Sequence, residues 1–133
     1  MTSVELVYLI ARVLTCGIWI AAGGYKATHF QHTVGEMTGL GIPLARLALP
    51  IVIVLELAGA VLVIADHYVW AVSIAWIVFM IPASYIYHFR FLIRDGTIDF
   101  PQWVTFWKNV SIAGGLLALI QLDTSRPAWL LAS

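Results

Sequence analysis

The chain has 133 residues, of which 62% are hydrophobic and only 11% charged, and its mean hydropathy is +0.94. Soluble domains are nearer half apolar and a quarter charged, so this composition indicates an integral membrane protein. Seven basic and seven acidic residues cancel, which excludes a nucleic-acid-binding protein that depends on a basic excess. The single cysteine, Cys16, excludes a disulfide scaffold, a CxxC redox pair and a thiolate site made by this chain alone.

Runs of apolar residues predict the membrane spans, because a helix needs about 20 such residues to cross the hydrocarbon core. In chain order, the four expected spans are 4–24, 47–65, 68–89 and 103–122. The first run lacks the basic segment and cleavage site of a signal peptide, so we expect it to remain in the mature protein. The middle of the long break after it, His29 to Leu40, is expected to form a short interfacial helix before the Gly39–Pro43 turn.

Short connections join the later spans. Asp66-His67 is expected to form a tight hairpin, Asp95-Gly96 a turn, and Pro101 the first residue of the last helix. Such connections make neighbouring helices antiparallel. The predicted fold class is therefore all-α: an integral membrane four-helix antiparallel bundle with a short interfacial helix between helices 1 and 2, forming one domain over residues 1–133.

The charges of the loops predict the orientation of this bundle. The first and third loops carry four basic residues, Lys26, Arg46, Arg90 and Arg94. The opposite side, which holds both termini, carries Arg126. The positive-inside rule therefore predicts that both termini lie outside the cytoplasm.

Three charged residues, Arg12, Glu56 and Lys108, fall inside the expected spans, where each charge costs at least about 2.5 kcal/mol. Counting about 1.5 Å of rise per residue places Arg12 and Glu56 at similar depths, so we expect them to form an ion pair. Lys108 either reaches Glu56 or extends to the membrane surface. One interpretation is that such a pair fixes the register of the helices and has no further role.

A functional interpretation follows from the balance of these charges. Arg12 and Lys108 are two cations facing one anion, Glu56, and Lys26 adds a third cation if it points inward. A low-dielectric site with excess positive charge favours an anion or an electron-rich polar ligand, such as a sulfur oxyanion, a quinone oxygen or a lipid phosphate.

Other polar residues give weaker signals. His29, His32 and Glu36 share one helical face at spacing that suits a metal, but Lys26 lies one turn away and repels a cation, so no metal site is predicted. His88 can hydrogen-bond a quinone or serve simply as a residue at the head-group level. Cys16 is expected to be inert packing.

A set of motifs in order along the chain carries a family resemblance. These are Arg12 in the first helix, Gly23-Gly24-Tyr25-Lys26 at its end, Gly39-Leu40-Gly41-Ile42-Pro43, Glu56-Leu57-Ala58-Gly59 in the second helix, and Trp107-Lys108-Asn109 before Gly114-Gly115 in the last. Together they resemble the DoxX family of small four-helix membrane proteins over nearly the whole chain. The family takes its name from likeness to a membrane subunit of thiosulfate:quinone oxidoreductase.

The resemblance implies a bacterial inner-membrane protein and a quinone-facing subunit of an oxidoreductase system, in which Glu56, Arg12 and Lys108 are the catalytic candidates. By position, Lys26 and Asn109, with His88, are the ligand-binding candidates. The expected partners are the lipid bilayer, a protein partner or further copies of the chain, and a quinone or small anion, but no nucleic acid. Two alternatives remain: a noncatalytic scaffold or assembly partner whose charges fix helix packing, and a small transporter or lipid-binding protein.

Overall fold

A computed structural model describes residues 1–130, and these are almost entirely helical. The elements in chain order are α1 (Ser3–Thr28), α2 (Phe30–Gly39), α3 (Ala45–Ile64), α4 (Val69–Tyr87), the 3₁₀ turn η1 (Phe89–Phe91), the antiparallel strands β1 (Ile93–Arg94) and β2 (Thr97–Ile98), α5 (Phe100–Leu122) and η2 (Ala128–Leu130). In this part of the chain, four helical segments are long and apolar enough to span a membrane. The predicted all-α membrane bundle is confirmed.

The helix boundaries agree with local capping chemistry. The hydroxyl of Thr2 accepts a hydrogen bond from the amide of Glu5, and the Glu5 carboxylate accepts one from the amide of Thr2, which fixes the start of α1. Asp99 caps α5 by accepting from the amide of Gln102, so that helix begins before Pro101 rather than at it. α1 also continues to Thr28, four residues beyond its expected end at residue 24, because no helix-breaking residue follows Gly24.

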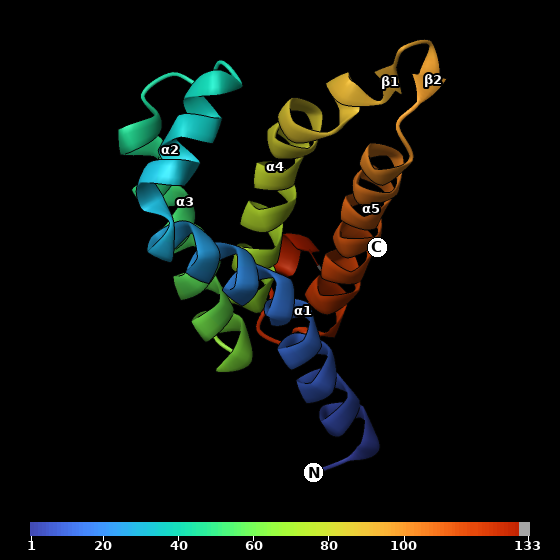
Figure 1. Cartoon of the computed structure of the whole chain (residues 1–133). Helices are drawn as coiled ribbons and strands as arrows, with labels where there is room; N and C mark the ends of the chain where they lie inside the picture. Colours follow the sequence, from blue (N-terminus) through green and yellow to red (C-terminus); the bar gives the residue numbers. More distant parts are fainter. Residues whose placement is uncertain (131–133) are drawn as a thin grey trace.

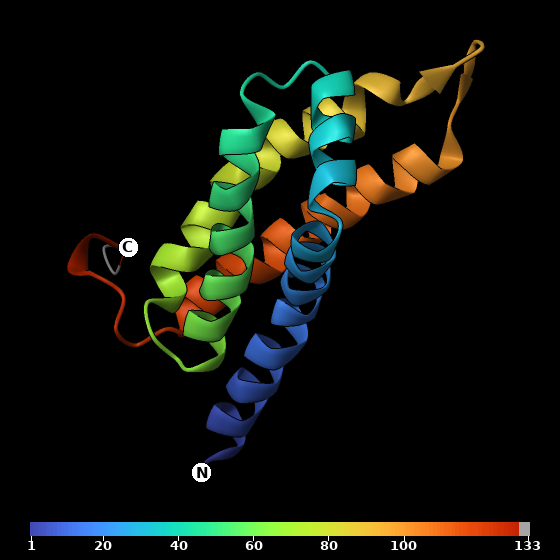
Figure 2. The same cartoon turned by 60° about the vertical axis from the view of Figure 1, so that its left-hand side comes forward.

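The expected turns are present. Asp66 has a φ of 61° in the tight connection between α3 and α4. Asp95 and Gly96 have φ values of 51° and 79° and join β1 to β2, which is the conformation that a two-residue hairpin requires. This hairpin projects beyond the ends of α4 and α5 (Figure 2).

The helices associate as two pairs that splay apart at one end (Figure 1). α1 packs along α3, and α4 packs along α5. α1 also extends about two turns past the end of α3. Its first part, Ser3 to Arg12, spans about 2.5 helical turns, and Arg12 is level with the end of α3. The short helix α2 continues from the end of α1 and packs on the first half of α3 (Figure 2).

The central core lies where the two helix pairs meet. The indole rings of Trp19 on α1 and Trp76 on α4 stack with centroids 4.3 Å apart. Gly59 lets the Trp76 ring pack closely on α3, because a Cβ at this position would lie 2.9 Å from the ring. A smaller cluster joins α2 to α3 through Met37 and Leu49.

The outer surface of the helices is apolar. Large side chains such as Leu14, Ile51, Val61, Ile81 and Leu117 are exposed, as expected for helices that face lipid chains rather than water. The two sides of the bundle also differ in their polar residues: Arg12 and Asp66 lie toward the α3–α4 turn, whereas Lys26 lies toward the opposite end of α1.

Candidate functional site

A cavity of about 450 Å³ lies between α2 and α3 on one side and α4 on the other, with α1 and α5 completing its walls. Its lining is mainly apolar and includes side chains such as Ile18, Met37, Leu49, Phe79 and Ile112. Pockets for small molecules in proteins usually have volumes of about 300–1,000 Å³ and mostly apolar walls with a few polar groups. The volume and lining of this cavity therefore suit a small organic ligand.

The buried carboxylate of the cavity, Glu56, forms an ion pair between two helices. Nζ of Lys26, in the last turn of α1, donates to Oε1 of Glu56 at 2.5 Å. Glu56 lies in the middle of α3 and is only 1% exposed. Gly23 allows the close approach of the helices, because a Cβ at this position would lie 3.1 Å from the Cβ of Glu56. The sequence therefore builds this pair by placing a glycine one turn before the lysine.

Two polar atoms on the cavity residues lack partners within residues 1–130. They are Oε2 of Glu56, the second oxygen of the paired carboxylate, and Nε1 of the Trp19 indole. The indole of Trp76, which stacks on Trp19, is in contrast satisfied because it donates to the backbone oxygen of Leu55 at 3.0 Å. Buried polar atoms are nearly always hydrogen-bonded. Glu56 and Trp19 therefore each carry one buried polar atom that the described residues leave unsatisfied.

Other polar side chains of the cavity are held by neighbours. The Asn109 side-chain nitrogen on α5 donates to Oγ of Ser84 on α4 at 2.9 Å. Nδ1 of His88 lies 2.7 Å from Oε1 of Gln102 and therefore carries the proton in this contact. These bonds tie α4 to α5 along the side of the cavity that faces the Lys26–Glu56 pair. The sequence-predicted ligand residues Lys26, Asn109 and His88 thus line one cavity together with Glu56.

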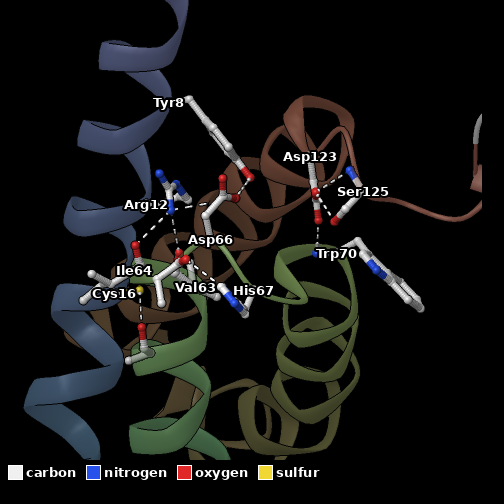
Figure 3. A network of polar contacts seen from close by, with 12 residues as sticks. Tyr8, Arg12, Cys16, Val63, Ile64, Asp66, His67, Trp70, Asp123 and Ser125 are labelled. Atoms are coloured by element: carbon white, nitrogen blue, oxygen red, sulfur yellow. Dashed lines mark hydrogen bonds and ion pairs between the residues drawn. The ribbon is translucent and has the colours of Figure 1, made fainter. Parts of the chain in front are cut away.

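Arg12 does not contact Glu56, so the expected pair between them is wrong. Nη1 of Arg12 donates instead to the backbone oxygens of Val63 and Ile64, at 3.1 and 2.9 Å, in the last turn of α3 (Figure 3). It lies 3.8 Å from Oδ1 of Asp66, and its guanidinium sits 4.6 Å from the centroid of the Tyr8 ring. Arg12 is level with the end of α3 because α1 extends past that end.

Lys108 also lies away from Glu56. It is exposed in a groove between α1 and α5 that Trp103, Trp107 and Thr15 help to line, and it forms no ion pair with any part of the chain that the structure describes. The expected surplus of cations around Glu56 is therefore absent from the described residues. Its one close cation is Lys26, and the pair is neutral overall.

The weak metal candidates point in different directions. His29 stacks on Tyr25 with ring centroids 4.1 Å apart, whereas His32 lies 3.2 Å from Glu36 on the exposed side of α2. Residues 1–130 contain no group of three His, Cys, Asp or Glu side chains placed to hold a metal ion. Cys16 is buried and donates to the backbone oxygen of Ala60 at 3.5 Å, which agrees with a packing role.

Sequence reasoning did not select Trp19 as a site residue, although its spacing through Gly23 places it on the same helical stripe as Lys26. Thr33 and Met37, which line the cavity from α2, were also missed, and Glu36 was considered only as a weak metal candidate. The available signal was the stripe itself, because side chains three or four positions apart share one helix face. The contribution of α2 depends on how it folds against α3, which the spacing of its residues does not reveal.

Taken together, the described residues define a small integral membrane protein with four membrane-spanning helices and a mostly apolar cavity beside a buried ion pair. The chain belongs to the DoxX family, whose sequence profile matches residues 7–89. The resemblance read from the sequence is thereby confirmed.

Two relatives from Escherichia coli (strain K12) are similar to this chain over most of its length. It is 33% identical to inner membrane protein YphA over 111 residues, which cover 84% of this chain and 79% of YphA. It is 29% identical to inner membrane protein YqjF over 111 residues, with the same shares covered. No solved structure matches the chain.

Proposed function

We propose that this DoxX-family protein is a redox-associated subunit of the bacterial inner membrane whose cavity holds the head group of a quinone. The observation that carries the proposal is the Lys26–Glu56 pair in the wall of a cavity of about 450 Å³ with mainly apolar lining. The names of the two relatives support the inner membrane as the location.

The cavity favours a neutral polar ligand over a free anion. Lys26 and Glu56 cancel in charge, and Glu36, which also lines the cavity, is acidic. Neither Arg12 nor Lys108 is among the residues of the cavity wall. Without excess positive charge, a dehydrated anion gains too little to offset its desolvation. A quinone carries polar oxygens on a flat, otherwise apolar ring, and this combination fits apolar walls that hold a few polar atoms.

A quinone accepts two electrons and two protons when it is reduced. In this proposal, Lys26 orients an oxygen of the head group by donating a hydrogen bond, and Glu56 accepts or releases a proton beside it. Asn109 and His88 keep α4 and α5 in place through their bonds to Ser84 and Gln102. The chain has a single cysteine, so its electrons come from a protein partner or another bound group rather than from a cysteine pair.

The test is a binding measurement on the whole protein in lipid nanodiscs with decylubiquinone, a quinone that has a short tail. Ala83 lines the cavity, so Ala83→Leu fills part of it. We expect this change to weaken binding about tenfold or more, because overpacking costs about 1–3 kcal/mol and 1.4 kcal/mol is a factor of ten.

Lys108→Ala is the matched control, because it removes a charge from the membrane span but lies outside the cavity. It should leave decylubiquinone binding unchanged. The proposal is wrong if the wild-type protein does not bind decylubiquinone, or if Ala83→Leu and Lys108→Ala bind it as tightly as the wild type.

The scaffold alternative is favoured by a different observation, the exposed Lys108 in the groove between α1 and α5. An unpaired cation in a span is costly in lipid and gains from a carboxylate on a neighbouring membrane protein. If the scaffold role is correct, Lys108→Ala should release a co-purifying membrane protein, and decylubiquinone should not bind at all.

A further inference from the structure

The cavity adjoins the groove between α1 and α5, because the two hollows share part of their walls. Ile18 of α1 and Ile112 of α5 line both of them. α1 and α5 diverge toward the end of the bundle that holds the β1–β2 hairpin (Figure 1), and neither isoleucine is buried. The groove, of about 830 Å³, is open to the outer surface, where its wall residue Leu14 is 73% exposed. A ligand in the cavity therefore lies next to a second hollow that faces the lipid.

The inner end of this groove is uncharged. Lys108, Ile112 and Gly115 follow one another at intervals of four and three residues, so they share one face of α5. Lys108 lies about 12 Å from the start of α5, whereas Gly115 lies about 22 Å from it. Beyond Ile112 the groove is lined by Leu14 and Thr15 of α1 and by Gly115. This end lies at the depth of the lipid tails, in the interior of a hydrocarbon core about 30 Å thick.

Gly115 leaves space in the inner end of the groove. A Cβ at Gly115 would meet no side chain or neighbouring helix within 4 Å. Gly23 and Gly59 differ, because a Cβ at these positions would lie 2.8 and 2.9 Å from a side chain of another helix. Those two glycines let helices pack closely, whereas Gly115 leaves room beside α5 that the described residues do not fill.

We propose that the ligand of the cavity is an amphiphile whose hydrocarbon tail leaves the cavity past Ile18 and Ile112 and lies in the groove beside Gly115. This inference rests on the proposed function and specifies its ligand as a quinone with a long tail. A head group held beside Lys26 and Glu56 leaves little room for such a tail within about 450 Å³. The tail therefore needs a path from the cavity to the bilayer.

The groove serves as a path for the tail rather than as a source of affinity. Lipid chains are as apolar as the groove wall, so a tail gains little free energy when it moves from the lipid into the groove. The other end of the cavity is a poorer exit, because Lys26, Glu36 and His88 line it and an alkyl chain would desolvate these polar groups. We therefore expect a blocked groove to weaken the binding of tailed ligands by steric exclusion, and to leave tailless ligands unaffected.

The experiment compares ubiquinone-0, which has no tail, with ubiquinone-4, whose tail has four isoprenoid units. Dissociation constants are measured on the whole protein in nanodiscs of fixed lipid composition. Gly115→Leu fills the inner end of the groove. We expect it to weaken the binding of ubiquinone-4 about tenfold, and to leave the binding of ubiquinone-0 within a factor of about two of wild type.

Gly114→Leu is the matched control, because it makes the same substitution at the adjacent residue. Gly114 also has nothing within 4 Å of its Cβ position, but it does not line the groove. This variant should bind both ligands as the wild type does. Each quinone partitions into the nanodisc lipid equally for every variant, so a comparison of variants with one ligand cancels that partitioning.

A second pair of variants blocks the groove from α1. Thr15→Phe adds a ring at the inner end of the groove, and Val13→Phe adds the same ring at an exposed position that does not line it. Thr15→Phe should weaken the binding of ubiquinone-4 alone, and Val13→Phe should change neither affinity. This pair decides the question if Gly115→Leu does not fold.

The outcomes distinguish this inference from the proposed function. If the groove variants leave the binding of ubiquinone-4 unchanged, or weaken both ligands equally, the tail does not lie in the groove. A lipid chain or a partner helix would then be its occupant, and the quinone site itself would stand. If the wild-type protein binds neither ligand, the proposed function and this inference both fail.

Discussion

Two cations on α1, the buried Arg12 and the partly buried Lys26, show what separates a structural charge from one at a binding site. Arg12 and Lys26 lie 14 residues apart, or about 21 Å along the helix, and both are directed at α3. Arg12 contacts backbone oxygens at the end of α3, whereas Lys26 pairs with a carboxylate beside a cavity. The partners of the two cations therefore differ. Arg12 binds the carbonyls at a helix end, whereas Lys26 binds a titratable side chain next to the cavity.

The Arg12 region resembles a helix C-cap supplied from another helix. The last carbonyls of a helix have no partner within it, and a cation near them also interacts favourably with the helix dipole. Asp66 adds an acceptor for Tyr8 at 3.2 Å, which joins α1 to the turn after α3. Within this group of Tyr8, Arg12 and Asp66, Nε of Arg12 is a buried atom that has no hydrogen-bond partner in residues 1–130. We therefore expect this region to contribute to stability and the Lys26 region to binding.

The largest expected effect in this comparison comes from Arg12→Met, which keeps an unbranched apolar stem but removes two charge-assisted hydrogen bonds. Each such bond contributes about 1.5–3 kcal/mol, so the loss of stability should be on the order of 3 kcal/mol. Thermal unfolding in detergent measures it. Binding of decylubiquinone by the folded fraction should not change, because Arg12 lies outside the cavity.

Lys108→Met is the control for this prediction, because it also removes a cation from a span but one that is exposed and unpaired in the described chain. Its stability should stay within about 0.5 kcal/mol of wild type. Equal losses for Arg12→Met and Lys108→Met would show that the hydrogen bonds to α3 contribute nothing, and the contrast between the two regions would fail.

Sequence reasoning predicted the fold well but paired the charges wrongly. The four spans follow from hydropathy, and the turns follow from Asp66 and Asp95-Gly96, because these signals are local. The error over Arg12 has a physical cause. Its partners are backbone oxygens, which every residue carries, so no residue type in the sequence marks them.

The cavity itself depends on information that the sequence holds only indirectly. Lys26 was expected to matter if it pointed inward, and it does so because Gly23 lets α1 approach α3. The role of Trp19 could not be predicted, since it follows from stacking with Trp76 on a helix that is distant in sequence. The depth estimate for Arg12 was also wrong, because α1 begins about two turns beyond the end of α3 and Arg12 is therefore level with Val63 and Ile64.

A second, smaller effect tests whether the side chains around Trp76 are tightly packed, in contrast to the open cavity. Gly59→Ala places a methyl group 2.9 Å from the fully buried Trp76 ring and 3.0 Å from Val72. We expect a loss of about 2 kcal/mol in thermal or denaturant unfolding, as is typical for overpacking. Gly114→Ala is the control, since nothing lies within 4 Å of its Cβ position, and it should be neutral or slightly stabilising.

A comparison of Gly59→Ala with Ala83→Leu tests where the packed core ends and the cavity begins. Ala83→Leu adds more volume than Gly59→Ala but does so at the cavity wall, so it should cost less stability while it weakens binding. If Ala83→Leu destabilised the protein as much as Gly59→Ala, the space beside Ala83 would be too small to accept a ligand, and the proposed site would have to be abandoned.

The smallest expected effect concerns Asp123, which lies on the same side of the bundle as Arg12 (Figure 3). Oδ2 of Asp123 accepts from the amide of Trp70 in the first turn of α4 at 2.9 Å, and Oδ1 accepts from the amide and hydroxyl of Ser125. It therefore acts as an N-cap for a helix other than its own. Asp123→Ala should cost about 1 kcal/mol, the usual value of such a cap, in thermal unfolding.

Asp123→Asn sharpens this last test, because it keeps an oxygen for the Trp70 amide and removes only the negative charge beside the N-terminus of α4. Its loss should be smaller than that of Asp123→Ala, since the hydrogen bond contributes more than the charge at a helix end. Neither variant should change the affinity for decylubiquinone. If an Asp123 variant changed the affinity for decylubiquinone but not the unfolding temperature, the end of the bundle that holds Arg12 and Asp123 would take part in binding. A cap on a helix end would then not by itself be evidence of a purely structural role.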